Sequence, residues 1–161
     1  MAFDQKQLRL VMRQWSTGVS VVSTLLNGKK HGMTVSSFTS VSIDPQIVVV
    51  SLMKISRTHD FVIEAGFFGI TILSDTQKFI SEIFAGQVAE SENRFDGIDT
   101  FEIKSGSPLI FGGLAFMDCA VIDVIEFQSN SLIFGEVLAA EVGETGKPLL
   151  YYNQHYHKLQ E

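Results

Sequence analysis

Residues 32–58, GMTVSSFTSVSIDPQIVVVSLMKISRT, contain the strands, the turn and the helix start around which the rest of the chain is arranged. Residues 33–40 read as a strand, but they carry hydroxyl side chains where a core strand would carry aliphatic ones. Asp44-Pro45 ends this run, because proline disfavours helix in the residue before it and favours a turn. The β-branched run 47–52 is short enough to be a buried strand.

The segment ends in a predicted helix start at Ser56. Serine is a favourable N-cap, and the first amides of a helix have no partner within the helix. These amides, the positive end of the helix dipole and the charges of Arg57 and Lys54 suit a phosphate group. The alternative interpretation is a Ser/Thr-rich hairpin followed by an ordinary capped helix, and such helices far outnumber phosphate sites.

The chain before this segment predicts a helix and a hairpin strand. Asp4 is a helix cap, with Gln7 in the capping-box position. One helical face carries the apolar side chains Leu8, Val11, Met12 and Trp15. A strand follows over residues 19–26, and Asn27-Gly28 predicts a tight hairpin because a type I′ turn needs positive φ at both central residues.

The chain after Thr58 alternates short helices and strands. The helix capped by Ser56 has an apolar face and ends at Gly66. A strand at 67–73 precedes a second helix, with Ser74 and Gln77 as its capping box. This helix is expected to bury Phe79, Ile80, Ile83 and Phe84. Residues 85–99 are a predicted loop.

Residues 115–127 and 132–142 are two long predicted strands, joined by a turn near Ser129-Asn130. The chain ends in an apolar and aromatic piece at 149–152 and Tyr156. Many short strands with few helices predict one domain over residues 1–161, a closed antiparallel barrel with helices packed outside.

Composition excludes several classes of function. The net charge of −6 argues against a nucleic-acid surface, and no apolar run approaches the roughly 20 residues of a membrane span. Cys119 is the one cysteine, which favours a reducing cytoplasm and a buried structural thiol. The four histidines and Cys119 form no metal motif, so no metal site is expected. There is no nucleophile elbow, P-loop or dinucleotide glycine fingerprint.

The segment from His31 to Ser42, together with Asp44-Pro45 and residues 56–58, resembles the flavin reductase-like family. Its members are the small reductase components of two-component flavin monooxygenases. The resemblance extends over residues 15–159. It implies a Greek-key split β-barrel of the FMN-binding type that forms a homodimer. It also implies transfer of hydride from NADH or NADPH to FMN or FAD, with an oxygenase component receiving the reduced flavin.

The resemblance also implies which residues bind flavin. Backbone amides and hydroxyls near the ring and ribityl chain would come from Met33, Thr34, Ser36 and Ser37, with Ser51 on the neighbouring strand. The phosphate would be held by Ser56, Arg57 and Thr58. The Phe84-Ala85-Gly86 step would lie beside the flavin, and Arg94 would reach a flavin phosphate or a dinucleotide.

Two departures from the family pattern concern the nicotinamide. Asn130 occupies the position where family members often carry histidine, and it offers a carboxamide both a donor and an acceptor. His155 and Tyr156 belong to the C-terminal aromatic element, where Asn153-Gln154-His155 replaces a more usual basic residue. We predict Asn130, His155 and Tyr156 as nicotinamide contacts. No catalytic acid or base is predicted, because hydride transfer uses the chemistry of the cofactors.

Two other functions remain open from the sequence. One is a flavin-binding or electron-carrying protein that reacts poorly with pyridine nucleotide, and the other is a split-barrel protein that binds haem. NADH consumption with added flavin tests the first, and an absorption spectrum tests the second.

Overall fold

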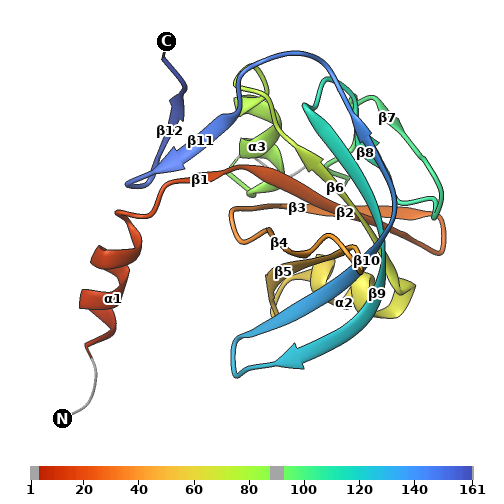
Figure 1. The fold of residues 1–161 in the computed structure, drawn as a ribbon, viewed down its shortest axis with the longest axis horizontal. Helices are drawn as coiled ribbons and strands as arrows, with labels where there is room; N and C mark the ends of the chain where they lie inside the picture. Colours follow the sequence, from red (N-terminus) through yellow and green to blue (C-terminus); the bar gives the residue numbers. More distant parts are fainter. Residues whose placement is uncertain (1–3, 88–92, 161) are drawn as a thin grey trace.

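The computed structural model describes residues 4–87 and 93–160 and is built mainly from antiparallel strands (Figure 1). The helices of this part of the chain are α1 (Gln5–Met12), α2 (Arg57–Ala65) and α3 (Lys78–Phe84). The longer strands are β2 (Ser20–Leu26), β3 (Lys29–Val35), β5 (Ile47–Met53), β6 (Phe67–Ile72), β9 (Ala115–Glu126) and β10 (Asn130–Val142). The shorter ones are β1 (Thr17–Gly18), β4 (Thr39–Ser42), β7 (Thr100–Phe101), β8 (Leu109–Ile110), β11 (Leu149–Tyr152) and β12 (His155–Lys158).

The main sheet has seven strands in the order β3-β2-β6-β9-β10-β5-β4, and its ladders are antiparallel. The prediction of a mainly β protein with a few helices is therefore confirmed. Among the described residues no ladder joins the edge strands β3 and β4, so hydrogen bonding does not confirm the predicted closed barrel.

The hairpin predicted at Asn27-Gly28 is confirmed. Both residues have positive φ, 50° and 77°, and Leu26 pairs directly with Lys29 across the two-residue turn. The turn fixes the register of β2 against β3, and this register sets which residues of β3 face the site.

The single strand predicted over residues 33–40 is wrong. β3 ends at Val35 and pairs with β2, whereas β4 begins at Thr39 and pairs with β5. The chain changes partners between these strands, so residues 36–38 leave the ladder. The hydroxyls of Ser36 and Ser37 lie in this connection.

Helix α2 begins and ends where the sequence predicts. The Ser56 hydroxyl accepts a hydrogen bond from the His59 amide at 3.2 Å, and Gly66 ends the helix in the left-handed conformation with φ 72°. Val62 joins the main core, while the Phe61 ring lies against His31 with 3.8 Å between ring centroids. The helix is therefore fixed at both ends and packs against the sheet.

Helix α3 differs from its prediction in its start and in one side chain. It begins at Lys78 with Gln77, not Ser74, as the N-cap residue, and no side chain caps it. One bond of the predicted capping box still forms, because the Ser74 amide donates to the Gln77 side chain at 3.1 Å. Phe84 is buried, but Phe79 is 61% exposed. The helix has only seven residues and buries Ser81 and Phe84, so Phe79 faces solvent.

Helix α1 forms as predicted but does not pack on its own domain. Asp4 caps it by accepting from the Lys6 amide at 2.8 Å. The predicted apolar face is exposed, including Leu8, Val11, Met12 and Trp15 beyond the helix end. Figure 1 shows α1 extending away from the sheet. The predicted apolar face is therefore present, but no residue of α1 is buried. The hydrophobic period predicts an apolar face without saying what covers it.

Candidate functional site

Most predicted flavin residues surround one cavity of about 790 Å³, called here the cationic cavity. It lies between the end of β3, the start of α2 and the end of α3. The predicted residues that line it are Met33, Thr34, Ser56, Arg57, Thr58, Phe84, Ala85 and Arg94. Lys30 and His31 line it as well. These residues come from distant parts of the sequence.

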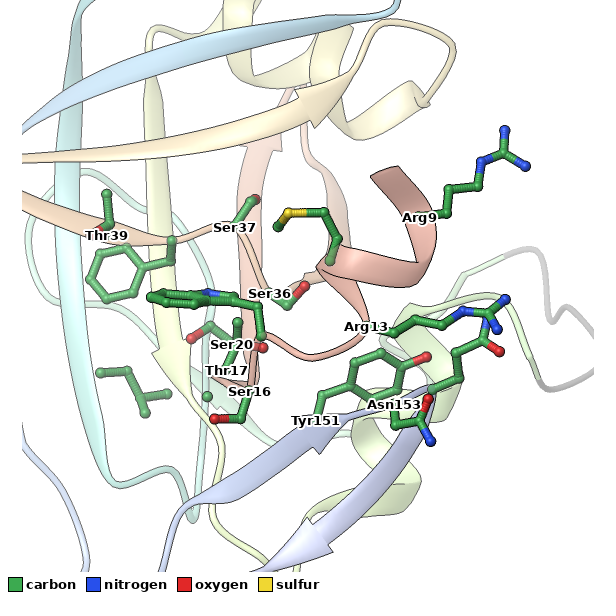
Figure 2. A pocket seen from close by; sticks show the side chains of 16 residues that line it. Arg9, Arg13, Ser16, Thr17, Ser20, Ser36, Ser37, Thr39, Tyr151 and Asn153 are labelled. Carbon is green, nitrogen blue, oxygen red and sulfur yellow. The ribbon is translucent and has the colours of Figure 1, made fainter. Parts of the chain in front are cut away.

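A second hollow of about 870 Å³, the α1 groove, is lined by residues 36–39 at the β3–β4 connection together with residues of α1 and β11. Figure 2 shows Ser36 and Ser37 on one side, with Arg9 and Arg13 near α1 and Tyr151 below. Trp15 and Phe38 add apolar surface to the same groove. The predicted flavin residues are therefore divided, with Met33 and Thr34 on the cationic cavity and Ser36 and Ser37 on the α1 groove.

The start of α2 presents one exposed cation to the cationic cavity. Arg57 is exposed, whereas Thr58 is only 3% exposed. The Ser56 hydroxyl is already engaged as the helix cap and lies 3.5 Å from the Met33 sulfur. An anion here would therefore meet the Arg57 side chain and the first amides of the helix before it meets the Ser56 hydroxyl.

The opposite wall carries further positive charge. Burial, followed by the charges of Arg57, Arg94 and Lys29, lowers the pKa of His31 below its ordinary 6.5. Arg94 is held by its guanidinium, which donates to the Phe84 carbonyl at 3.1 Å and to the Gly32 carbonyl at 3.4 Å. This clustering of cations around one cavity favours an anionic ligand.

Gly86 keeps the space beside Arg94 open. Its φ is 71°, and a Cβ built there would lie 3.2 Å from the Arg94 Nη2 atom. Gly86 does not line the cationic cavity, but its lack of a side chain leaves room for Arg94, which lines the cavity.

Lys54 does not add to this charge as the sequence predicts. Its Nζ atom pairs with Glu126 Oε2 at 2.6 Å, and Lys54 is absent from the cavity lining. The hydrogen bond and the charge of Lys54 lower the pKa of Glu126. The pairing arises because the β9–β10 hairpin lies beside the end of β5, a proximity that the local sequence does not show.

Ser37, Ser51 and Asn130 form a small hydrogen-bond network. The Ser37 hydroxyl donates to the Ser51 carbonyl at 2.9 Å and accepts from the Ser51 amide at 3.2 Å. The Asn130 amide group donates to the Ser51 hydroxyl at 3.3 Å. Asn130 opens β10 opposite Met53, which lines the cationic cavity. A predicted nicotinamide residue is thus bonded to a predicted flavin residue.

The hydroxyl of Thr34 in β3 is used within the fold. The Thr34 hydroxyl donates to the Ser81 carbonyl at 2.7 Å and so joins β3 to α3. Thr34 lines the cationic cavity, but its hydroxyl proton is committed.

His155 and Tyr156 lie away from Asn130 within one chain. The Tyr156 hydroxyl bonds to Ser81 at 2.8 Å, and His155 Nδ1 contacts the Asn153 carbonyl at 2.8 Å. In Figure 1, β12 and the tip of the β9–β10 hairpin lie at opposite sides of the molecule. A single chain therefore does not bring the three predicted nicotinamide residues together.

Sequence reasoning missed several residues that line the two hollows. His31 was detectable, because alternate residues of a strand share a face and Met33 was already predicted. Gly32 sits where a Cβ would lie 3.0 Å from the Phe84 ring, so glycine permits the packing of α3 on β3. The remaining missed residues are Lys30, Met53, Ile55, Asn93 and Phe95 in the cationic cavity. In the α1 groove they are Arg9, Met12, Arg13, Trp15, Ser16, Thr17, Gly18, Ser20, Phe38, Thr39, Ile72, Tyr151, Asn153 and Gln154.

Two further structural features bear on the class of protein. Within residues 4–87 and 93–160, no helix is long and apolar enough to cross a membrane. Cys119 is buried, and burial with the neighbouring Asp118 charge raises its pKa to about 12.

Comparison with known proteins identifies a family over almost the whole chain. Residues 12–160 match the model of the flavin reductase like domain. A "Probable flavin reductase" of Rhizobium meliloti is 39% identical over 140 residues, which are 86% of this chain and 44% of the relative. The chain thus spans less than half the length of that relative.

A second relative and a solved structure match at nearly full length. The "NADH-dependent flavin reductase StyB" of Pseudomonas fluorescens is 32% identical over 157 residues, covering 96% of this chain and 89% of the relative. The styrene monooxygenase flavin reductase of Pseudomonas putida S12 superimposes with a TM-score of 0.86 at 31% identity, covering 96% of this chain and 98% of that one.

Proposed function

The chain belongs to the flavin reductase-like domain family, and from this premise we propose that it is an NAD(P)H-dependent flavin reductase. The flavin supplies the chemistry when bound, by accepting a hydride from the nicotinamide. The task of the protein is therefore to bind the two cofactors and to orient one against the other. The similarity to a styrene monooxygenase flavin reductase supports an oxygenase component as the receiver of reduced flavin.

The observation that carries this proposal is the cationic cavity. Arg57 at the start of α2 faces a cavity that Lys30, His31 and Arg94 also line. A phosphate suits this cavity, because helix amides and cations converge on it while the nearest cap hydroxyl is already bonded. FMN, FAD and the pyridine nucleotides all carry such a phosphate.

The division of residues around the β3–β4 connection fits an elongated cofactor. Met33 and Thr34 line the cationic cavity, and Ser36 and Ser37 line the adjacent α1 groove. A flavin with its phosphate at Arg57 would direct its ring along this connection toward Ser37 and Ser51. Asn130, bonded to Ser51, would then contact the carboxamide of the nicotinamide.

We also propose a split barrel and a homodimer. The Ser37–Ser51 hydrogen bonds support the barrel, because they tie the segment after β3, at one edge of the sheet, to β5 near the other edge. The uncovered apolar residues of α1 support the dimer, since a second copy would remove them from water. Leu149 of the C-terminal apolar piece is buried within the chain.

The decisive experiment is NADH or NADPH consumption by the purified protein with free FMN or FAD added. Turnover that depends on both flavin and nicotinamide supports the proposal. Flavin binding without nicotinamide oxidation would replace it with the flavin-binding or electron-carrying protein. An absorption spectrum typical of haem in the purified protein would contradict both of these functions and would indicate a haem-binding protein.

A further inference from the structure

His59 connects helix α2 to strand β10 through both of its ring nitrogens. Nδ1 lies 2.9 Å from Asp60 Oδ1, and Nε2 lies 2.9 Å from the Ser131 hydroxyl. His59 is 8% exposed and Ser131 is fully buried. Asp60 lies at the surface, so the hydrogen bonds from Asp60 through His59 to Ser131 extend from solvent into the protein interior.

This connection is not needed to hold the strands together. Ser131 is already paired with Leu52, and Asn130 with Met53, in the ladder between β10 and β5. A buried imidazole and hydroxyl are costly to desolvate unless they bond to each other, and an apolar pair would fill the space without that cost. The directional hydrogen bond of the polar pair fixes the position of the first turn of α2 relative to the start of β10.

The two ends of this connection are the two ends of the proposed site. His59 follows Arg57 and Thr58 in the first turn of α2, which lines the cationic cavity. Ser131 follows Asn130, whose amide group bonds to Ser51. His59 therefore links the proposed phosphate end to the proposed nicotinamide end, and neither His59 nor Ser131 lines either hollow.

We propose that His59 is a positioning residue that sets the distance between the phosphate anchor on α2 and Asn130 on β10, and thereby aligns flavin with nicotinamide. This inference rests on the proposed function. The His59–Ser131 hydrogen bond carries the alignment, whereas the exposed Asp60 only orients the ring. Loss of that bond lets the first turn of α2 move while the phosphate contacts of Arg57 remain intact.

Two substitutions of His59 separate its two hydrogen bonds. Glutamine places an amide near the position of Nε2 and keeps the bond to Ser131, whereas asparagine reaches only the position of Nδ1 and loses it. His59→Asn and Ser131→Ala are expected to slow flavin reduction at saturating NADH about tenfold, because small misplacements of reacting groups reduce rates strongly. His59→Gln and Asp60→Asn are expected to stay within about threefold of wild type.

Two further measurements distinguish a positioning role of His59 from a purely structural one. The dissociation constant for FMN or FAD, from fluorescence titration, should change little in every variant. The charge-transfer absorbance formed when NAD⁺ is added to dithionite-reduced flavin on the protein should weaken in His59→Asn and Ser131→Ala only. The thermal midpoint of the flavin-free protein records any loss of stability separately.

The inference is overturned if His59→Asn and Ser131→Ala keep the wild-type rate and charge-transfer absorbance, even with a lower thermal midpoint. Equal losses in His59→Gln and His59→Asn would overturn it too, because the Ser131 bond would then not be the cause. If the wild-type protein itself fails to oxidise NADH or NADPH with added flavin, the proposed function fails, and this inference fails with it.

Discussion

The side-chain amide of Asn130 donates a hydrogen bond to the hydroxyl of Ser51 at 3.3 Å. Ser51 is in turn bonded through its backbone to the Ser37 hydroxyl. Asn130 is the first residue of strand β10, and its side-chain oxygen accepts a hydrogen bond from the Ser129 hydroxyl at 2.9 Å. This relationship connects the residue with the clearest departure from the family pattern to residues proposed to face the flavin.

Asn130→Ala is expected to raise the Michaelis constant for NADH more than it lowers the turnover number, because it removes ground-state contacts to the carboxamide. Asn130→His should be tolerated, since an imidazole offers a comparable donor or acceptor. Glu141→Ala changes an exposed residue of the same strand that lines neither hollow, and it serves as the control. Steady-state kinetics decide the matter. If both Asn130 variants keep the wild-type Michaelis constant and turnover number, the nicotinamide binds elsewhere.

Arg57→Ala is expected to weaken flavin binding by roughly 1.5–3 kcal/mol, or about 10- to 150-fold, through loss of a charge-assisted hydrogen bond to phosphate. The fold should remain intact because the side chain is exposed. Lys6→Ala removes a cation of α1 outside both hollows and serves as the control. Fluorescence titration with FMN and FAD measures the effect. An unchanged dissociation constant in Arg57→Ala would remove Arg57 from the site.

Gly86→Ala and Gly28→Ala form a matched pair. Both glycines have positive φ, 71° and 77°, so each alanine variant should lose roughly 1–2 kcal/mol of stability. Only the Gly86 variant places a Cβ 3.2 Å from Arg94 Nη2, whereas nothing lies within 4 Å of a Cβ at Gly28. Gly86→Ala alone should therefore weaken flavin binding. Denaturant unfolding and flavin titration of both variants test this, and equal flavin affinities would contradict it.

The lowered pKa of His31 makes stability depend on pH in a defined direction. Burial and the charges of Arg57, Arg94 and Lys29 hold the folded pKa below the ordinary 6.5. Between the two pKa values the unfolded chain binds more protons, so the free energy of unfolding rises with pH. This contribution of His31 is complete above the unfolded pKa and is lost as pH falls through the folded pKa. His31→Gln should flatten this part of the profile. Urea unfolding of both proteins above and below pH 6.5 checks it, and parallel profiles would refute it.

Light scattering should give twice the 17.8 kDa mass of one chain at micromolar concentration. Val11→Glu places a charge on the exposed apolar face of α1 and should shift the equilibrium toward the monomer. Ile43→Glu changes an even more exposed apolar residue in the turn between β4 and β5 and serves as the control. A fully active wild-type monomer would contradict the proposed dimer.

Local sequence signals predicted the elements that depend on neighbouring residues. The Asn27-Gly28 turn and the Ser56 cap with its Gly66 stop lie where the sequence placed them, because each depends on the backbone preferences of a few adjacent residues. The predicted burial of Phe79 is wrong, because hydrophobic period predicts an apolar face but not whether another element covers it. The apolar face of α1 is likewise exposed.

The sequence by itself determined the mainly β character, the hairpin, the capped helix α2 and the residue types that suit a phosphate. Tertiary structure alone decided how those residues are grouped. Pairing of β10 with β5 brings Asn130 to Ser51, and the β9–β10 hairpin withdraws Lys54 to Glu126. The change of partner between β3 and β4 divides the hydroxyls of residues 33–37 between two hollows. The physical reason is range: turns and caps follow from local backbone energies, whereas strand pairing, charge pairing and cavity walls follow from contacts between residues far apart in the chain.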